Sequence, residues 1–403
     1  MRKKNKVRLD KHHGPSEALG LYLHIPFCQE RCHYCDFLTF PHIERYHEPY
    51  VQALLKEIAL VGQGQRVDSI YIGGGTPSLL GKDQFDRIFQ ALLTHFSWQG
   101  GEWTLEANPG SLTEDKLEAL AQAGVNRLSL GVQTMSDALL QVCGRTHQAQ
   151  TVETDLKRIR AVAPFDLNLD FIFAIPGQKL SDIDRDLAAI ERFQPGHISW
   201  YNLILEERTL FSYWLAKGRI QKASEDEELA LMERAYQGLE DLGYQRYEIS
   251  NFARPGKASR HNLKYWTGRD YLGLGLGAAS YVDHKRFHNT SHFFTYLHDL
   301  DQGLLPRIWE QRSREEDLFE ALMMGFRKLD GIDRRDFLAR FGEDPMQRAP
   351  QFFESERRAG RLAWTDRRVY LTTTGLQLQN VFLLGLLDFY SSSSQSPGED
   401  LFS

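Results

Sequence analysis

Three of the chain's four cysteines stand close together near its N-terminus, in the spacing CxxxCxxC. They are Cys28, Cys32 and Cys35, whereas Cys143 lies far along the chain and is predicted to be a small buried hydrophobic residue. Thiolates are soft ligands, so a loop that carries three of them can wrap one face of a zinc or iron–sulfur centre. Any fourth ligand would have to come from elsewhere.

Zinc and iron–sulfur clusters make different demands on that missing ligand. Structural zinc takes four tetrahedral ligands, so it would require His24, His33 or Cys143 as the fourth. A [4Fe–4S] cluster usually takes four thiolates, and three would leave one iron open to a small molecule. A chance grouping of reduced cysteines in an apolar loop is the third alternative, but the residues around these cysteines are largely polar. The loop therefore favours an iron–sulfur cluster with an open iron.

The elements that must position this loop form a repeating pattern between residues 21 and 245, where β-rich runs alternate with amphipathic helical patterns. The predicted strands are Leu21–Ile25, Ser69–Ile72, Trp103–Glu106, Arg127–Val132, Leu167–Phe173 and Ile198–Leu203. The predicted helices between them include Tyr50–Val61, Asp83–Thr94, Glu114–Ala121, Thr151–Val162 and Asp182–Arg192. Six strand–helix units in succession predict a parallel sheet with right-handed crossovers. The predicted fold class is α/β, a partial (β/α)6 TIM-like barrel.

Beyond the barrel the pattern changes. A further helix over Glu225–Leu242 leads into residues 246–305, which are predicted to be a connecting region. After Pro306 the chain predicts helices over Glu315–Phe326 and Arg334–Phe341 and a hairpin over Arg361–Leu371. These indicate a small C-terminal winged-helix-like α+β domain over residues 306–390. Residues 1–20, which are basic, and 391–403 are predicted to be disordered tails.

The length and composition of the chain indicate a globular protein and favour one cellular location. The chain has 403 residues, a formal charge of −6 and 42 % hydrophobic residues, enough for one large core and a smaller domain. The longest apolar stretch, residues 380–390, is too short to span a bilayer, and no signal peptide is predicted. Three cysteines grouped together favour a reducing compartment, so the predicted location is the cytoplasm. Net acidity argues against a nucleic-acid-binding regulator, and peripheral contact with a membrane stays open.

Polar residues collect where the predicted strands end, which is where barrels place their functional sites. The second strand ends in the glycine-rich Gly73–Ser78, where the missing side chains let backbone N–H groups approach an anionic or amino-acid ligand. The next two strands bring Glu106 and Gln133 to the rim. Asp170 stands in an apolar strand, where a carboxylate is costly unless it is paired, and Arg145 is an eligible partner. Each feature alone has a structural explanation, but together they predict a ligand site.

The cysteine spacing, with the aromatic Tyr34 before the last cysteine, resembles the radical S-adenosylmethionine (SAM) superfamily. The resemblance implies that Cys28, Cys32 and Cys35 hold a [4Fe–4S] cluster. It also implies that the methionine moiety of SAM chelates the open iron through its amino and carboxylate groups.

Four further segments narrow the resemblance, which covers about residues 20 to 385. They are LYLHIPFC at 21–28, YIGGGTPS at 71–78, GRTH at 144–147 and AIPGQ at 174–178. They resemble the group that contains oxygen-independent coproporphyrinogen III oxidase and HemW. The oxidase carries a further cysteine where this chain has Phe37, and HemW-like proteins carry such a phenylalanine and an HNxxYW motif, here HNLKYW at 261–266.

The HemW-like resemblance implies a haem chaperone rather than an enzyme, with the cluster, SAM and haem as cofactors and apo-haemoproteins such as respiratory enzymes as partners. The alternative is the oxidase, which would use a 5′-deoxyadenosyl radical. The resemblance also implies that SAM contacts Tyr22, Gly74, Gly75, Thr76, Glu106, Gln133, Arg145 and Asp170.

His261 of the HNxxYW motif is the candidate haem ligand. Imidazole is a common axial ligand, and Tyr265 and Trp266 could stack on the macrocycle. The alternative, given equal weight, is a histidine that caps a turn after Ser259 with the aromatic residues in the core. A histidine that the family often has is Ala279 in this chain, so a ligand role at that position is absent.

Overall fold

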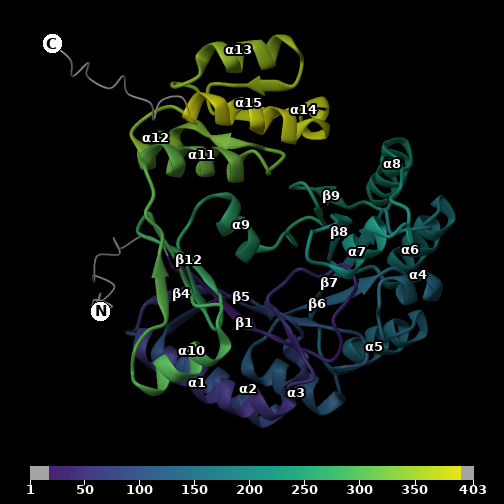
Figure 1. Ribbon diagram of the computed structural model, residues 1–403, viewed down its shortest axis with the longest axis vertical. Coiled ribbons are helices and arrows are strands. Elements are labelled where there is room, and N and C mark those ends of the chain that lie inside the picture. The colour runs from purple at the N-terminus through teal and green to yellow at the C-terminus, as the bar shows by residue number, and fades with distance from the viewer. Residues whose placement is uncertain (1–17, 392–403) are drawn as a thin grey trace.

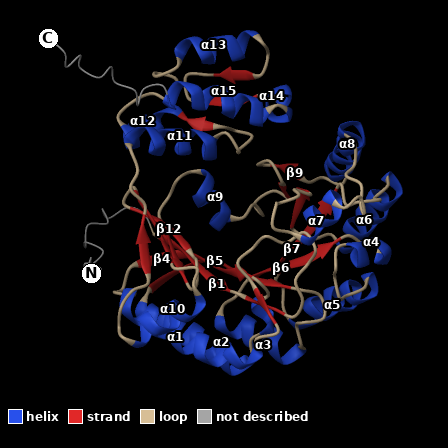
Figure 2. Ribbon diagram, viewed as in Figure 1, coloured by secondary structure: helices blue, strands red, loops and turns tan. Residues whose placement is uncertain are grey.

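The computed structural model describes residues 18–391 as a large curved sheet with a smaller domain above its concave side (Figure 1). In this part of the chain, the sheet has twelve strands in the order β14-β13-β12-β11-β1-β4-β5-β6-β7-β8-β10-β9. Helices α1, α2, α3 and α5 cover its convex side, and α9 lies on the concave side (Figure 2). Nothing closes the ring between the two edges of this sheet, so the α/β class and the partial barrel are confirmed.

The central strands of the sheet run parallel. In order across the sheet they are β11 (Tyr271–Leu274), β1 (Leu19–Ile25), β4 (Arg66–Gly74), β5 (Ser97–Ala107), β6 (Arg127–Gln133), β7 (Asp166–Phe173) and β8 (His197–Asn202). Antiparallel strands extend both edges: β12 (Ala279–Val282), β13 (Lys285–Asn289) and β14 (Arg307–Trp309) on one side, and β10 (Asn251–Ala253) and β9 (Gln245–Arg246) on the other.

The helices follow the strands as a barrel requires. They are α1 (His47–Val61), α2 (Lys82–His95), α3 (Glu114–Ala123), α4 (Asp137–Val142), α5 (Ala149–Val162), α6 (Leu180–Phe193), α7 (Leu210–Ala216), α8 (Glu225–Asp241), α9 (Arg260–Trp266) and α10 (Phe293–Asp301). All six predicted strands and the six predicted helices of this part are confirmed, although β5 begins at Ser97, six residues before the predicted start at Trp103.

A seventh parallel strand, β11, was not predicted. It pairs with β1, with Leu21 opposite Leu272, although it comes late in the chain. Glycine residues weaken the strand signal of its sequence. Glycine is needed at position 273 because a Cβ atom there would lie 2.2 Å from the carbonyl oxygen of Ala279, so that β12 can pack closely against β11. Residues 246–305, expected to be a connecting region, therefore contribute strands to the main sheet.

The two faces of the sheet differ in character because strand side chains alternate. On β5, Trp103 packs against Phe89 of α2, with ring centroids 5.2 Å apart. Glu102, Thr104 and Glu106 alternate with it and therefore share the concave face. The convex side buries the apolar core, and the concave side is lined with polar groups.

The C-terminal domain has a hydrophobic core of its own. It comprises α11 (Arg314–Gly325), β15 (Ile332–Asp333), α12 (Arg334–Phe341), α13 (Pro350–Arg358), β16 (Leu362–Trp364), β17 (Arg368–Leu371), α14 (Thr373–Gln377) and α15 (Gln379–Ser391). The predicted helices and the hairpin are confirmed, and β15 joins the hairpin in a three-stranded sheet.

The apolar stretch near the C-terminus forms α15, which buries Phe382, Leu386 and Tyr390 in the core of this domain. Its opposite face leaves Val381 and Leu384 exposed. Among the helices of residues 18–391, none combines the length and the apolarity that crossing a bilayer requires.

The predicted tails fall mostly outside the described residues. β1 begins at Leu19, so the boundary placed at residue 20 falls inside a strand. Residues 1–17 and 392–403 lie outside the described part.

Candidate cofactor site

The cysteine loop lies at the carboxyl ends of the parallel strands. It leaves the sheet after β1 through β2 (Phe27–Cys28), which pairs with β3 (Phe40–Pro41). His33 ties the loop to the turn after α4: its backbone N–H donates to the Cys143 carbonyl oxygen (3.0 Å), and its Nδ1 lies 2.8 Å from the Val142 carbonyl oxygen. Cys143 itself is fully buried among apolar side chains, as predicted.

Two of the three cysteine sulfur atoms receive hydrogen bonds. Arg145 donates through Nη1 to Cys32 Sγ (3.2 Å), and the Thr76 hydroxyl donates to Cys28 Sγ (3.8 Å). Burial, with the neighbouring Cys32 and Cys28, raises the pKa of Cys35 to about 11. Burial also raises the pKa of Cys28. A cationic metal centre would offset the repulsion between these thiolates, so the loop fits the cluster that the sequence predicts.

The three thiols of the loop are candidate ligands of a cluster or of a single ion. Within residues 18–391, no three His, Cys, Asp or Glu side chains are arranged to hold one metal ion. Four irons separate their thiolate ligands more widely than one zinc ion does. The choice between the cluster and zinc therefore stays a prediction that metal analysis of the protein can test.

The glycine-rich segment after β4 is packed too closely for side chains. A Cβ atom would lie 2.8 Å from the Glu106 carboxylate at Gly73, 2.5 Å from the His24 ring at Gly74, and 2.4 Å from the Phe27 carbonyl oxygen at Gly75. The backbone N–H of Gly74 donates to Glu106 (3.1 Å), and that of Gly75 to the Ile25 carbonyl oxygen (2.8 Å). These N–H groups, predicted to meet a ligand, already have partners in the protein.

Two carboxylates lie half-buried at the rim, and neither forms an ion pair with a side chain of residues 18–391. Glu106 accepts from the Tyr71 hydroxyl (2.6 Å), and loss of hydration, together with Asp170, raises its pKa to about 7. Asp170 accepts from Ser129 (2.9 Å) and Asn168 (2.8 Å), and burial raises its pKa. Because two carboxylates disfavour each other's charge, this rim suits a cationic ligand with hydrogen-bond donors. SAM, with its sulfonium, ammonium and ribose hydroxyl groups, is such a ligand.

Arg145, the predicted partner of Asp170, points elsewhere. Besides Cys32, its guanidinium donates to the Gly131 carbonyl oxygen (2.6 Å) and to Asn108 Oδ1 (2.7 Å). A Cβ atom at Gly131 would lie 2.8 Å from Gln133 Nε2 and 3.1 Å from Arg145 Nη2. Asn108 was not predicted as a site residue. It stands two residues after Glu106, so the alternation of strand side chains could have placed it on the same face.

Tyr22 completes the rim from β1. Its hydroxyl lies 2.9 Å from His24 Nδ1, and its ring centroid is 6.3 Å from that of Tyr71. The structure thus gathers the predicted SAM contacts from five different strands and their following turns around the cysteine loop.

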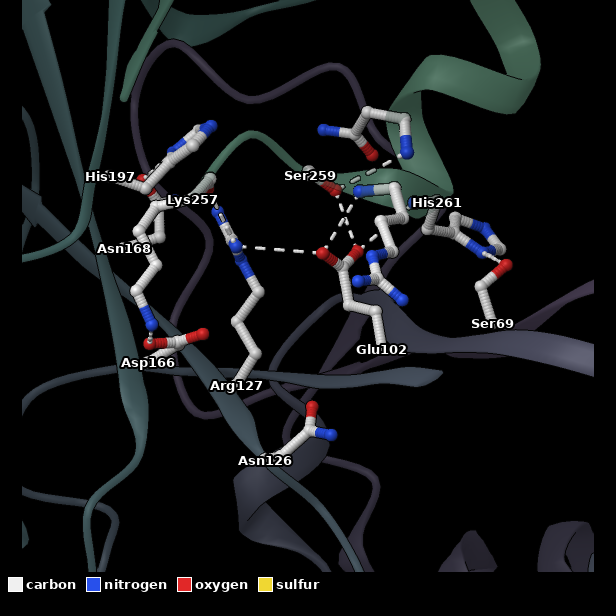
Figure 3. A network of polar contacts seen from close by, with 12 residues as sticks. Ser69, Glu102, Asn126, Arg127, Asp166, Asn168, His197, Lys257, Ser259 and His261 are labelled. Carbon is white, nitrogen blue, oxygen red and sulfur yellow. Dashed lines mark hydrogen bonds and ion pairs between the residues drawn. The ribbon is translucent and has the colours of Figure 1, made fainter. Parts of the chain in front are cut away.

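His261, the predicted haem ligand, lies deeper on the concave face (Figure 3). It is 0 % exposed, and its Nδ1 lies 3.0 Å from Ser69 Oγ and its Nε2 2.8 Å from the Tyr265 hydroxyl. Its ring stacks on Tyr71 at 5.4 Å, and burial lowers its pKa to about 3. Neither ring nitrogen is free to bind iron in this conformation, which agrees with the alternative of a buried structural histidine. Trp266 is likewise engaged, with the Arg327 guanidinium 4.7 Å above its ring.

The helix that carries His261 is held at both ends. Figure 3 shows the Glu102 carboxylate beneath the start of α9, where it accepts from Ser259 Oγ (2.8 Å) and from the N–H groups of Arg260 (3.0 Å) and His261 (3.1 Å). Arg127 lies 3.5 Å from the same carboxylate. At the other end, Arg340 of α12 donates to the carbonyl oxygens at 267 and 268, both at 2.6 Å. The HNxxYW helix is thereby fixed against the amino ends of the strands.

Comparison with known protein families matches two parts of the chain. Residues 22–190 match the radical SAM superfamily, and residues 313–378 match the HemN C-terminal domain. The heme chaperone HemW of Bacillus subtilis is 34 % identical over 367 residues, covering 89 % of this chain and 96 % of the relative. The heme chaperone HemW of Escherichia coli is 35 % identical over 335 residues, covering 80 % of this chain and 86 % of the relative.

The fold is also similar to a solved structure. Escherichia coli coproporphyrinogen III oxidase (HemN), described as a radical SAM enzyme, superposes with a TM-score of 0.80 at 22 % identity, covering 93 % of this chain and 91 % of the other. At that identity the likeness shows a shared fold, including the C-terminal domain.

Proposed function

Because the chain belongs to the HemW family of radical SAM proteins, we propose that it is a haem chaperone that carries a [4Fe–4S] cluster with exchangeable SAM and passes haem to apo-haemoproteins. Relatives named heme chaperone HemW, about a third identical to the chain over most of its length, carry this proposal. All four cysteines are free thiols, which suits the cytoplasm as the place of action.

The cluster would be held by Cys28, Cys32 and Cys35. When bound, it supplies a redox centre with one iron open to SAM. The half-buried carboxylates of Glu106 and Asp170 would bind donor groups of SAM, and the Thr76 and Arg145 donors would orient the cysteine sulfur atoms. Gln133 and Tyr22 would close the rim around the ligand.

Phe37 separates this proposal from the oxidase. It is 63 % exposed beside the cysteine loop, at the position where the oxidase pattern carries a further cysteine. The fold shared with the oxidase does not argue for its activity in this chain. Product formation from coproporphyrinogen III is therefore the result that would favour the oxidase activity over the chaperone role.

The test is anaerobic reconstitution of the cluster in the full-length protein, followed by two parallel measurements. The first is haem titration followed by the Soret band, and the second is product formation from coproporphyrinogen III with SAM and a reductant. We expect stoichiometric haem binding, no decarboxylated product, and transfer of haem to an apo-haemoprotein. Turnover of coproporphyrinogen III in catalytic excess would overturn the chaperone proposal.

A further inference from the structure

A single amide side chain connects the donors that reach two of the cluster cysteines. Asn108, at the end of β5, accepts from Arg145 Nη2 through Oδ1 (2.7 Å) and donates through Nδ2 to Thr76 Oγ1 (2.8 Å). Arg145 in turn donates to Cys32 Sγ (3.2 Å), and Thr76 donates to Cys28 Sγ (3.8 Å). Cys28 and Cys32 are thus joined by one continuous chain of hydrogen bonds that passes through Asn108.

The direction of every bond in this chain follows from the chemistry of its members. A guanidinium can only donate, so the oxygen of the Asn108 amide must face Arg145. The NH2 group must then face Thr76, whose hydroxyl oxygen accepts from it. The hydroxyl proton of Thr76 is therefore left to point at Cys28 Sγ. If the Asn108 amide were turned the other way, Thr76 or Arg145 would lose its partner, and a cysteine sulfur would lose its hydrogen-bond donor.

The surroundings also hold the amide in place. Asn108 Oδ1 would lie 3.1 Å from a Cβ atom at Gly131, next to Gln133 Nε2 at 2.8 Å. A larger residue at 131 would push both groups away. The left-handed conformation of Gln133, with φ of 69°, turns its side chain toward the same point.

We propose that Asn108 is a positioning residue for the cluster, which aims Thr76 at Cys28 and Arg145 at Cys32 and so sets the reduction potential. This inference rests on the cluster part of the proposed function but not on haem. Hydrogen bonds to cluster sulfur atoms stabilise the more negative, reduced state and raise the potential. Groups that orient metal ligands in this way affect metal centres without touching the metal.

The test is a potentiometric titration of the reconstituted cluster, monitored by electron paramagnetic resonance without SAM. Asn108→Leu removes the amide without adding charge, and we expect a more negative midpoint potential at unchanged iron content. Thr76→Val should shift the potential in the same direction, whereas Thr76→Ser, which keeps the hydroxyl, should resemble the wild type. The double variant Asn108→Leu with Thr76→Val should shift by less than the sum of the single variants, because Asn108 acts partly through Thr76. Asn380→Leu, at an exposed site on α15 in the C-terminal domain, is the matched control.

Each outcome decides the matter. A fully loaded Asn108→Leu protein with the wild-type potential overturns the inference, as does a double variant with strictly additive shifts. If Asn108→Leu fails to fold, the comparison of Thr76→Val with Thr76→Ser decides, and equal potentials in those two variants overturn it. A wild-type protein that takes up no cluster refutes the proposed function itself, and a cluster without haem binding refutes only the chaperone role.

Discussion

Replacing His261 with alanine distinguishes a haem ligand from a structural residue. The substitution removes an imidazole that is fully buried between Ser69 and Tyr265. Both hydroxyl groups lose their partner, and the Tyr71 ring loses its stacking contact. A ligand role predicts changes in the haem spectrum, whereas the observed contacts predict changes in stability.

The magnitude follows from the two hydroxyl groups. A buried polar group left without a partner costs about 1–3 kcal/mol, so His261→Ala should lower the free energy of unfolding by about 2–6 kcal/mol. That is a large share of the roughly 5–15 kcal/mol that is usual for a folded domain. His261→Asn can place its amide near the position of Nδ1 and keep the contact with Ser69. It should therefore cost about half as much.

The assay combines urea unfolding, followed by tryptophan fluorescence, with haem titration of the folded variants. We expect the stability order wild type, His261→Asn, His261→Ala, and an unchanged Soret maximum in all three. His298→Ala, at an exposed site on α10, is the control for the loss of a histidine. A folded His261→Ala protein that loses the Soret band, or that unfolds within about 1 kcal/mol of the wild type, would refute the reasoning from buried partners.

Three further changes test other parts of the structure. Cys28→Ser should abolish the visible absorption of the reconstituted cluster, whereas Cys143→Ala should keep it; equal spectra would exclude Cys28 as a ligand. Glu102→Leu leaves the buried Arg127 without its carboxylate partner and should lower the free energy of unfolding in urea by about 3–5 kcal/mol. Glu102→Gln, which still accepts from α9, should cost less, and the reverse order would contradict the role of the carboxylate. Burial raises the pKa of Asp186, a residue of α6, to about 8. Between pH 4 and 8 the native state therefore keeps a proton on this carboxyl group that the unfolded state releases. The stability that this proton contributes is complete below pH 4 and is lost as the pH rises to 8. Asp186→Asn should therefore flatten the pH dependence of stability between pH 4 and 8, and a profile as steep as that of the wild type would contradict this assignment.

The sequence predicts the strands that belong to the repeating strand–helix pattern. Parallel strands buried on the helix side give continuous β-rich runs, and each is followed by an amphipathic helix. β11 breaks this rule, because it has no following helix and because Gly273 and Gly275 weaken its strand signal. Its partner β1 lies some 250 residues earlier in the chain, as the pairing of Leu21 with Leu272 records. No local pattern carries that information.

The residues of the candidate site also differ in whether local sequence can predict them. The sequence predicts Glu106 and Gln133 as site residues because each stands at or next to the end of a predicted strand, and Asp170 because a carboxylate is unusual in an apolar strand. The true partners of Arg145 could not be found, because they depend on which side chains face one another across neighbouring strands. His261 shows the limit most clearly: the residue type suits an iron ligand, but only the structure shows that the ring is buried and that both of its nitrogens have hydrogen-bond partners.

The concave face is divided into two layers with different capacities for ligands. At the amino ends of the strands, the Glu102 carboxylate is neutralised by Arg127 and by the donors of α9. At the carboxyl ends, Glu106 and Asp170 lie at one rim, and both have raised pKa values and no ion pair within the described part of the chain. Since α9 already occupies the inner layer, we expect a ligand to bind at the outer one. The cysteine loop lies at that outer layer, so the proposed exchange of SAM would take place at the carboxyl ends of the strands.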